Sequence, residues 1–218
     1  MKVLTRVAFI GLMAALATAA AAAETLTKTN FALDAQNVRE AECTAGDVLA
    51  DAVRQAGKSE VAFVQANQLR QDVIAAGPVT TEALTGLLLY PNEHIVSTKL
   101  SGTQIREALE RSLWMLPRPS TGFLQIAGLS LTYRSTQPAG GRVVEVQVAG
   151  AALDPDKTYT VAMPASLAKG DQGYFRVFQN LKTEEGPSIG EALVGYVRTG
   201  LKSAPQPDRI QDLSKPGH

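Results

Sequence analysis

A glycine-containing loop followed by two aromatic residues is the segment of this sequence whose residue types and spacing fit ligand binding. The loop 169–173 (KGDQG) contains Gly170 and Gly173, which allow positive φ and a close approach of a ligand to the backbone, and the aromatic pair Tyr174-Phe175 follows at once. The preceding segment 157–163 is β-branched and aromatic, as expected of a strand entering a core. A rigid strand, a mobile loop and an aromatic face can together present a flat ring to a flat ligand. The same residues also fit a β-turn whose aromatic side chains fill the core.

Residues for hydrolytic chemistry are scarce. The chain has two histidines, His94 and the terminal His218, whereas a two-metal phosphatase site needs several His, Asp and Asn ligands. There is no G-x-S-x-G, P-loop or G-x-G-x-x-G motif. We therefore expect no catalytic residue, metal ligand or cofactor in this chain. The single cysteine, Cys43, is interpreted as a small hydrophobe rather than a nucleophile, and His94 as a strand residue with a polar contact.

The first 23 residues have the pattern of a cleaved secretory signal. Lys2 and Arg6 precede an apolar run over 7–20, and 21–23 (AAA) supplies the small residues that a signal peptidase requires. The run is short and alanine-rich, and no later segment reaches the roughly 18 apolar residues of a spanning helix. We therefore expect residues 24–218 to form a periplasmic or secreted domain with no membrane anchor after signal cleavage.

Charge and cysteine content exclude some classes of partner and of architecture. The chain has 21 Lys and Arg against 21 Asp and Glu, with no basic run, which argues against nucleic acid or an anionic membrane as the main ligand. With one cysteine, an exported chain has no internal disulfide, so the hydrophobic core must hold the domain together.

Four segments carry apolar residues at helical spacing and begin with a start signal. They are 44–57, 80–88, 101–113 and 188–200. Thr44 is expected to cap the first, and capping boxes begin the last two at Ser101 and Ser188. Glu107 and Arg111 are expected to pair at i,i+4 on the exposed side of the third helix.

Strand patterns alternate with these helices. They cover 61–64, 95–100, 124–126, 129–133, 144–148 and 157–163, while 71–78 is expected to be a loop. The segments 129–133 and 144–148 predict a β-hairpin, and a change of alternation near Gly128 predicts a β-bulge. This mixed order of elements predicts a layered single domain of the α+β class with a mixed sheet.

Six short segments then add up to a family pattern. They are 42–54 (ECTAGDVLADAVR), 99–109 (KLSGTQIREAL), 123–133 (FLQIAGLSLTY), 153–161 (LDPDKTYTV), 167–174 (LAKGDQGY) and 208–210 (DRI). In order and spacing, from about Val38 to Ile210, the chain resembles the C-terminal domain of the 5′-nucleotidase family, which includes UDP-sugar hydrolases and cyclic-nucleotide phosphodiesterases. The resemblance implies that this domain binds a nucleoside. The family's metallophosphatase domain, which carries two metals, has no counterpart in the sequence, where only residues 24–37 precede the match.

The resemblance implies part of a substrate-binding set in the first half of the domain. Arg39 matches the family's early arginine, and Arg70 matches the arginine that ends its N-G-G-G-I-R motif. The asparagine that opens that motif is Gln65 here, and its glycines are replaced over 66–68 (ANQ). An arginine pair suits phosphate or ribose oxygens through forked hydrogen bonds.

The resemblance implies the remaining members of the set around two aromatic positions. Gly170 and Gly173 match the family's glycine loop, and Tyr174 matches the aromatic that follows it. The second stacking aromatic falls on Pro91, with Tyr90 one place earlier. Half of the expected aromatic clamp is therefore displaced in this sequence.

The function implied by the resemblance is substrate recognition for nucleotide phosphoester hydrolysis. A nucleoside or nucleotide is the expected ligand, and a metallophosphatase on a separate chain is the expected partner and the place of any divalent metal. Two alternatives are a stand-alone nucleoside or nucleotide receptor without chemistry, and a degenerate domain kept as a protein-interaction module.

Overall fold

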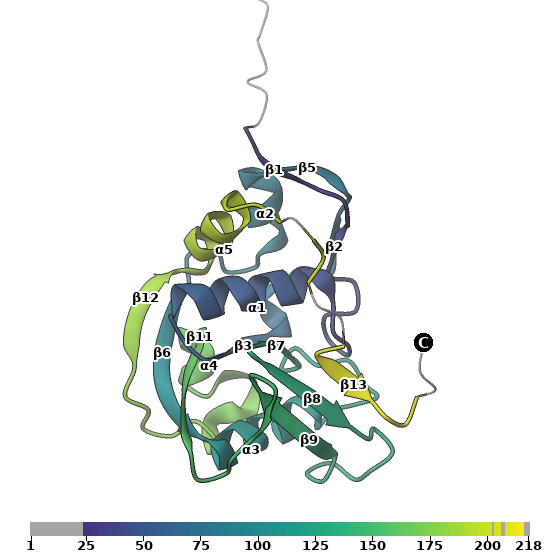
Figure 1. The fold of residues 1–218 in the computed structure, drawn as a ribbon, viewed down its shortest axis with the longest axis vertical. Coiled ribbons are helices and arrows are strands. Elements are labelled where there is room, and N and C mark those ends of the chain that lie inside the picture. The colour runs from purple at the N-terminus through teal and green to yellow at the C-terminus, as the bar shows by residue number, and fades with distance from the viewer. Residues whose placement is uncertain (1–23, 202, 206–207, 216–218) are drawn as a thin grey trace, which may run out of the picture.

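A five-stranded mixed sheet forms the centre of the molecule in the computed structural model, which describes residues 24–201, 203–205 and 208–215 (Figure 1). Its strands, in spatial order, are β12 (Glu184–Ser188), β6 (His94–Ser101), β11 (Thr158–Pro164), β3 (Val61–Gln65) and β7 (Leu124–Ala127). Strands β11 and β3 are parallel, and the other neighbouring pairs are antiparallel. Every residue of β3 and β7 is buried, so both faces of the sheet are covered at the β3–β7 side.

A second sheet of four strands extends from the first. Its spatial order is β10 (Ala151–Ala152), β9 (Val143–Val148), β8 (Leu129–Tyr133) and β13 (Ile210–Asp212). The predicted hairpin is the antiparallel pair β8–β9. The bulge predicted near Gly128 is wrong, because Gly128 instead separates β7 in one sheet from β8 in the other. Gly128 has φ 78°, and a Cβ there would overlap the carbonyl oxygen of Glu60, so glycine is required at the crossing.

Five α-helices and two 3-10 helices cover these sheets in the described residues. They are α1 (Thr44–Ala56), η1 (Ala66–Gln68), α2 (Thr81–Leu87), α3 (Gly102–Leu113), α4 (Ala165–Ala168), η2 (Asp171–Arg176) and α5 (Ile189–Arg198). Helix α1 packs against β3, β7 and α5, and α3 packs against β6, β9 and η2. The capping boxes at Ser101 and Ser188 are both confirmed.

Two short strand pairs, which the sequence did not predict, hold the segments on either side of the first helix. Strand β1 (Thr25–Thr29) pairs with β5 (Gly77–Thr80), and β2 (Leu33–Asp34) pairs with β4 (Val73–Ile74). The segment expected to be a loop over 71–78 therefore supplies two edge strands. Thr44 does not cap α1, because its hydroxyl donates to the carbonyl of Ala32 and accepts from the amide of Asp34.

The predicted α+β class with a mixed sheet is confirmed. Within the described residues, no helix has the length and apolar character needed to cross a membrane. The predicted signal over residues 1–23 lies outside the described part of the chain.

Candidate functional site

Four loops meet at one edge of the five-stranded sheet, the edge formed by strand ends: the loops that follow β3 and β11 and the loops that precede β6 and β7. Because β3 and β11 are parallel, both end at this edge, and because β6 and β7 run antiparallel to them, both begin there. In open α/β sheets, ligands bind outside the carboxyl ends of the strands, and β3 and β11 are the parallel pair of this sheet. We call this place the sheet-edge site and define it by six polar residues: Arg39, Gln65, Asn67, Gln68, Glu93 and Ser166.

A hydrogen-bond network centred on Glu93 joins three of these loops. The Glu93 carboxylate accepts from Nε2 of Gln68 at 2.7 Å and from the amide of Ser166 at 2.7 Å. The Ser166 hydroxyl in turn accepts from Nε2 of Gln65 at 3.0 Å. The network fixes the ends of β3 and β11 against the turn that precedes β6, so the polar groups at this edge are held in place before any ligand arrives.

Four buried polar atoms of the sheet-edge site have no hydrogen-bond partner. They are Nε of Arg39, Oε1 of Gln65, Oδ1 of Asn67 and Oε1 of Gln68. Leaving a buried polar atom unpaired costs about 1–3 kcal/mol, and such atoms are rare in folded proteins. One donor and three acceptors at this edge are therefore left without a hydrogen-bond partner within the described protein.

Backbone contacts place Arg39 beside the end of β3. The amide of Ser120 donates to the carbonyl of Arg39 at 2.8 Å, and the amide of Asn67 donates to the carbonyl of Thr121 at 3.1 Å. The two site residues thus flank the short segment that precedes β7. Of the sequence-predicted residues, the structure brings Arg39 and Gln65 into the sheet-edge site.

Arg70 and Tyr90 lie beside the site rather than in it. Arg70 is exposed, and its Nε donates to the carbonyl of Gly86 at 3.1 Å, which turns the guanidinium toward the end of α2. Tyr90 is 52% exposed in the turn before β6, where its carbonyl accepts from the amide of Glu93. The contacts of the described residues leave the Tyr90 ring free, so its role as a ligand residue stays a prediction.

The glycine loop has the positive-φ backbone that its glycines predicted, and Arg111 of α3 contacts it. Gly170 and Gly173 have φ of 91° and 85°. Arg111 donates from Nε to the carbonyl of Gly173 at 3.2 Å and from its second nitrogen to the carbonyl of Gln172. The expected Glu107–Arg111 pair is therefore absent among the described ion pairs, because Arg111 holds this loop instead.

The close approaches at these glycines are to the protein itself. A Cβ at Gly170 would overlap the backbone of Phe175, and a Cβ at Gly173 would overlap the guanidinium of Arg111. On the other side of the loop, the Thr121 hydroxyl donates to the Gln172 side chain. The glycines are thus explained by internal packing, and a direct role in binding stays a prediction.

Tyr174 is a core residue, so the prediction that its ring offers a stacking face is wrong for this structure. Its side chain is fully buried, its hydroxyl donates to the carbonyl of Gly122 at 2.7 Å, and its ring stacks on Phe178 with centroids 5.5 Å apart. Burial raises its pKa well above the usual range for tyrosine. The alternative reading, in which an aromatic of this pair fills the core, holds for Tyr174, whereas Phe175 is 59% exposed.

The two residues with reactive side chains behave as the sequence suggested. Burial raises the pKa of the Cys43 thiol to about 12, which keeps it protonated near neutral pH. His94 begins β6 and contacts Glu185 at 3.2 Å and the carbonyl of Gly186 at 3.0 Å. In the described ranges, no three His, Cys, Asp or Glu side chains are grouped so as to hold a metal ion.

Sequence reasoning missed Glu93, Ser166 and Arg111 as organising residues. Gln68 and Asn67 carried a signal, because they replace glycines of the family motif with side chains that can hydrogen-bond. The sequence gives no such signal for Glu93, because a single carboxylate in a turn has the same pattern as an exposed charged residue with no structural role.

Removing the Glu93 carboxylate should loosen the sheet-edge site. We expect Glu93→Ala to lower the free energy of unfolding by about 1–3 kcal/mol, because the Gln68 side chain and the Ser166 amide lose their acceptor. Urea denaturation measures the loss. The neighbouring exposed Asn92→Ala is the control and should change stability by less than about 0.5 kcal/mol. Equal stabilities of the two variants would contradict the network.

Comparisons with known proteins point to one family. A family model described as "5'-nucleotidase, C-terminal domain" matches residues 17–180. An apyrase of Anopheles gambiae is 28% identical over 179 residues, which cover 78% of this chain and 31% of the apyrase. The trifunctional nucleotide phosphoesterase protein YfkN of Bacillus subtilis (strain 168) is 30% identical over 157 residues, which cover 67% of this chain and 11% of that protein.

The structural comparison agrees with the sequence comparison. A crystal structure of a 5'-nucleotidase precursor from Thermus thermophilus superimposes with a TM-score of 0.78 at 26% identity, covering 88% of this chain and 40% of that one. The chain therefore spans about a third of the length of the apyrase and two fifths of the solved 5'-nucleotidase.

Proposed function

Because the chain belongs to the family of the 5'-nucleotidase C-terminal domain, we propose that it binds a nucleoside or nucleotide at the sheet-edge site and serves substrate recognition in nucleotide phosphoester hydrolysis. A metallophosphatase on a separate chain supplies the metals and the hydrolytic step in this proposal. The signal pattern of residues 1–23 supports a periplasmic or secreted location for the pair.

One observation carries the proposal: the unpaired buried atoms at the ends of β3 and in the loop before α1. Amide oxygens such as those of Gln65, Asn67 and Gln68 suit the donors of a base edge or a ribose hydroxyl. The Arg39 guanidinium suits ribose or phosphate oxygens. A nucleoside offers both kinds of group within one molecule, so it can satisfy the donor and the acceptors together.

Calorimetric titration against nucleosides and nucleotides tests the binding. We expect saturable binding of at least one nucleoside or nucleotide, and a loss of about tenfold or more in affinity for Arg39→Ala, because a hydrogen bond to a charged group contributes about 1.5–3 kcal/mol. The matched control is Arg198→Ala, since Arg198 is an exposed arginine at the end of α5. Its affinity should equal that of the unaltered protein.

Two outcomes would contradict the proposed site. The first is an absence of heat of binding for every compound of the panel. The second is binding that Arg39→Ala and Arg198→Ala leave equally strong, because a ligand held elsewhere would not distinguish the two arginines.

Recovery of partners from the native host, with and without added nucleotide, separates the proposal from its alternatives. An exported metallophosphatase recovered more strongly with nucleotide supports the shared-substrate role, because the nucleotide then contacts both chains. Nucleotide binding without such a partner would favour a stand-alone receptor. A partner retained equally by an Arg39→Ala, Arg70→Ala double variant, with or without nucleotide, would favour an interaction module.

A further inference from the structure

We propose that the hollow between α3, the β8–β9 connection and η2 is a second binding site, for a planar aromatic group that carries a negative charge. We call it the Trp114 groove and define it by Trp114, Phe175, Arg176, Val177, Gly140 and Met115. The inference is independent of the proposed function, because it concerns a different surface of the molecule.

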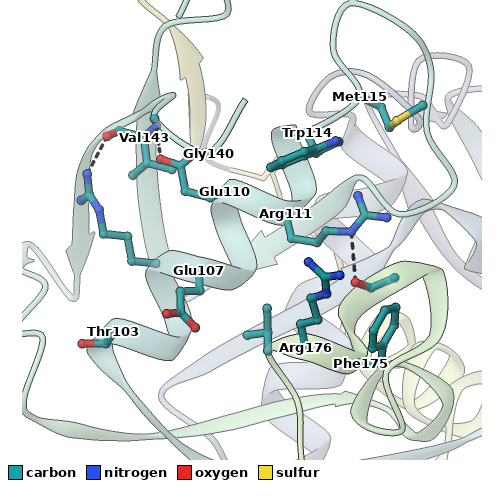
Figure 2. Close-up of a pocket in the computed structure, with 14 residues that line it drawn as sticks. Thr103, Glu107, Glu110, Arg111, Trp114, Met115, Gly140, Val143, Phe175 and Arg176 are labelled. Atoms are coloured by element: carbon teal, nitrogen blue, oxygen red, sulfur yellow. Dashed lines mark hydrogen bonds between the residues drawn. The ribbon is translucent and has the colours of Figure 1, made fainter. Parts of the chain in front are cut away.

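The size and walls of the groove suit a small organic ligand. Its volume is about 810 Å³, within the range of about 300–1,000 Å³ that ligand pockets occupy. One wall is α3 and its continuation to Met115, the second is the connection at Gly140 and Gly141, and the third is η2 with Val177 (Figure 2). Arg111 joins the first wall to the third, because it donates from α3 to the carbonyls of Gly173 and Gln172 in η2.

Two largely exposed aromatic rings line this hollow, and among the described residues neither of them stacks on another aromatic ring. Trp114 is 53% exposed and Phe175 is 59% exposed. Figure 2 shows Trp114 on one side of the groove and Phe175 on the other, with the guanidinium groups of Arg111 and Arg176 between them in this view. An aromatic side chain buries about 150–250 Å² when it is covered, and ring faces favour flat partners. The pair therefore favours a planar aromatic ligand.

The charges in the groove favour an anion. Arg176 is exposed, and among the described residues no carboxylate forms an ion pair with it. The Arg176 guanidinium lies 5.8 Å from the centroid of the Phe175 ring. A ligand whose ring stacks on Phe175 would therefore place its negative charge within reach of Arg176.

The other charged groups of the groove already have partners or stand apart. Arg106 donates to the carbonyl of Val143, and Glu110 accepts from the amides of Arg142 and Val143. Arg111 donates to the carbonyls of Gly173 and Gln172 in the glycine loop. Glu107 is an exposed carboxylate on α3 that also lines the groove. Arg176 is thus the group that an anionic substituent would reach.

The Trp114 groove is distinct from the sheet-edge site. None of the six residues that define the sheet-edge site lines the groove. Of the sequence-predicted ligand residues, only Gly173 lines the groove. A ligand of the groove would therefore bind without occupying Arg39, Gln65 or Asn67.

Fluorescence of Trp114, the only tryptophan in the chain, gives a direct test. The probes are 4-nitrobenzoate, its neutral counterpart 4-nitrobenzyl alcohol, and inorganic sulfate, each titrated into the full chain. We expect saturable static quenching by 4-nitrobenzoate and affinity for the alcohol weaker by about tenfold, because a hydrogen bond to a charged group is lost. Sulfate should leave the emission unchanged, since it has no ring to stack.

Two variants test separately the binding of the ligand's negative charge and the binding of its aromatic ring. Arg176→Gln should lower the affinity for 4-nitrobenzoate by about tenfold and leave the affinity for the alcohol unchanged. Phe175→Ala should lower the affinity for both compounds. Both residues are exposed, so the fold should tolerate the changes, and Arg198→Gln is the matched control. Purely collisional quenching that is equal for the acid and the alcohol, or equal affinities in Arg176→Gln and Arg198→Gln, would overturn the proposal.

Discussion

Replacement of Tyr174 by alanine is expected to destabilise the protein by about 3–5 kcal/mol, the usual cost of deleting a buried aromatic ring. The reason is packing: the side chain is fully buried and stacked on Phe178, and its hydroxyl donates to Gly122. Tyr174→Phe keeps the ring and loses the hydroxyl, so it should cost about 1 kcal/mol. Urea denaturation followed by circular dichroism measures both losses.

The adjacent Phe175 supplies a matched control for this prediction. Because its ring is mostly exposed, Phe175→Ala should change the free energy of unfolding by less than about 0.5 kcal/mol. Similar small losses for Tyr174→Ala and Phe175→Ala would contradict the structure. They would restore Tyr174 as an exposed platform, as the family resemblance implied.

A buried carboxyl cluster gives the second large effect, on the pH dependence of stability. Arg209 pairs with Asp51 at 2.8 Å and lies 3.8 Å from Asp47. The amide of Ile210 donates to Glu42 at 2.8 Å. Oδ1 of Asp47 and Oε1 of Glu42 are buried without a hydrogen-bond partner, and a proton on Asp47 would supply the missing donor. Burial, followed by the charge of Glu42, raises the pKa of Asp47 to about 8.

The direction of the pH effect follows from this raised pKa. Between pH 3.8, the unperturbed value, and about 8, the folded state holds a proton on Asp47 that the unfolded state has lost. The stabilisation is therefore complete below the unfolded pKa and is lost as pH rises through about 8, by at most about 1.4 kcal/mol per pH unit. We expect Asp47→Asn to flatten this decline, because the amide carries no charge at either pH.

Urea denaturation at pH 5 and at pH 8 measures the difference. The free energy of unfolding of the unaltered protein should fall between these pH values by more than that of Asp47→Asn. Asp156→Asn, an exposed aspartate in the turn before β11, should follow the unaltered protein. Parallel declines in Asp47→Asn and Asp156→Asn would show that Asp47 is already ionised at pH 5.

Elements whose signals are local could be predicted from the sequence. The capping boxes at Ser101 and Ser188 lie within four residues and form as predicted. The strand over 157–163 is β11, and Gly170 and Gly173 have the positive φ that their types suggested. In each case the residues that determine the structure are neighbours in the chain.

Features set by distant partners could not be predicted. The Gly128 crossing depends on Glu60, which is far away in the chain. Adjacent aromatics such as Tyr174 and Phe175 give the same signal, and only the turn of η2 decides which of them is buried.

The sheet-edge site shows the same division between local and distant signals. The family pattern led to Gln65, at the end of β3, and to Arg39, whose carbonyl accepts from the amide of Ser120 before β7. The family pattern gave no sign of Glu93. Its role depends on contacts with Gln68, which follows β3, and with Ser166, which follows β11. The family pattern also gave no sign that Arg70 differs from Arg39: the Arg70 guanidinium contacts the carbonyl of Gly86 in α2 and lies beside the site.

Chemical-shift mapping with adenosine 5′-monophosphate tests the central claim most directly, because it reports where a nucleotide binds. We expect the largest changes in ¹⁵N–¹H spectra at 65–70, at 120–123 and at 165–172, the loops around the sheet edge. The Arg39→Ala variant should show these changes only at higher nucleotide concentration. Shifts confined to the Trp114 groove, or no shifts at any concentration, would contradict nucleotide binding at the sheet edge.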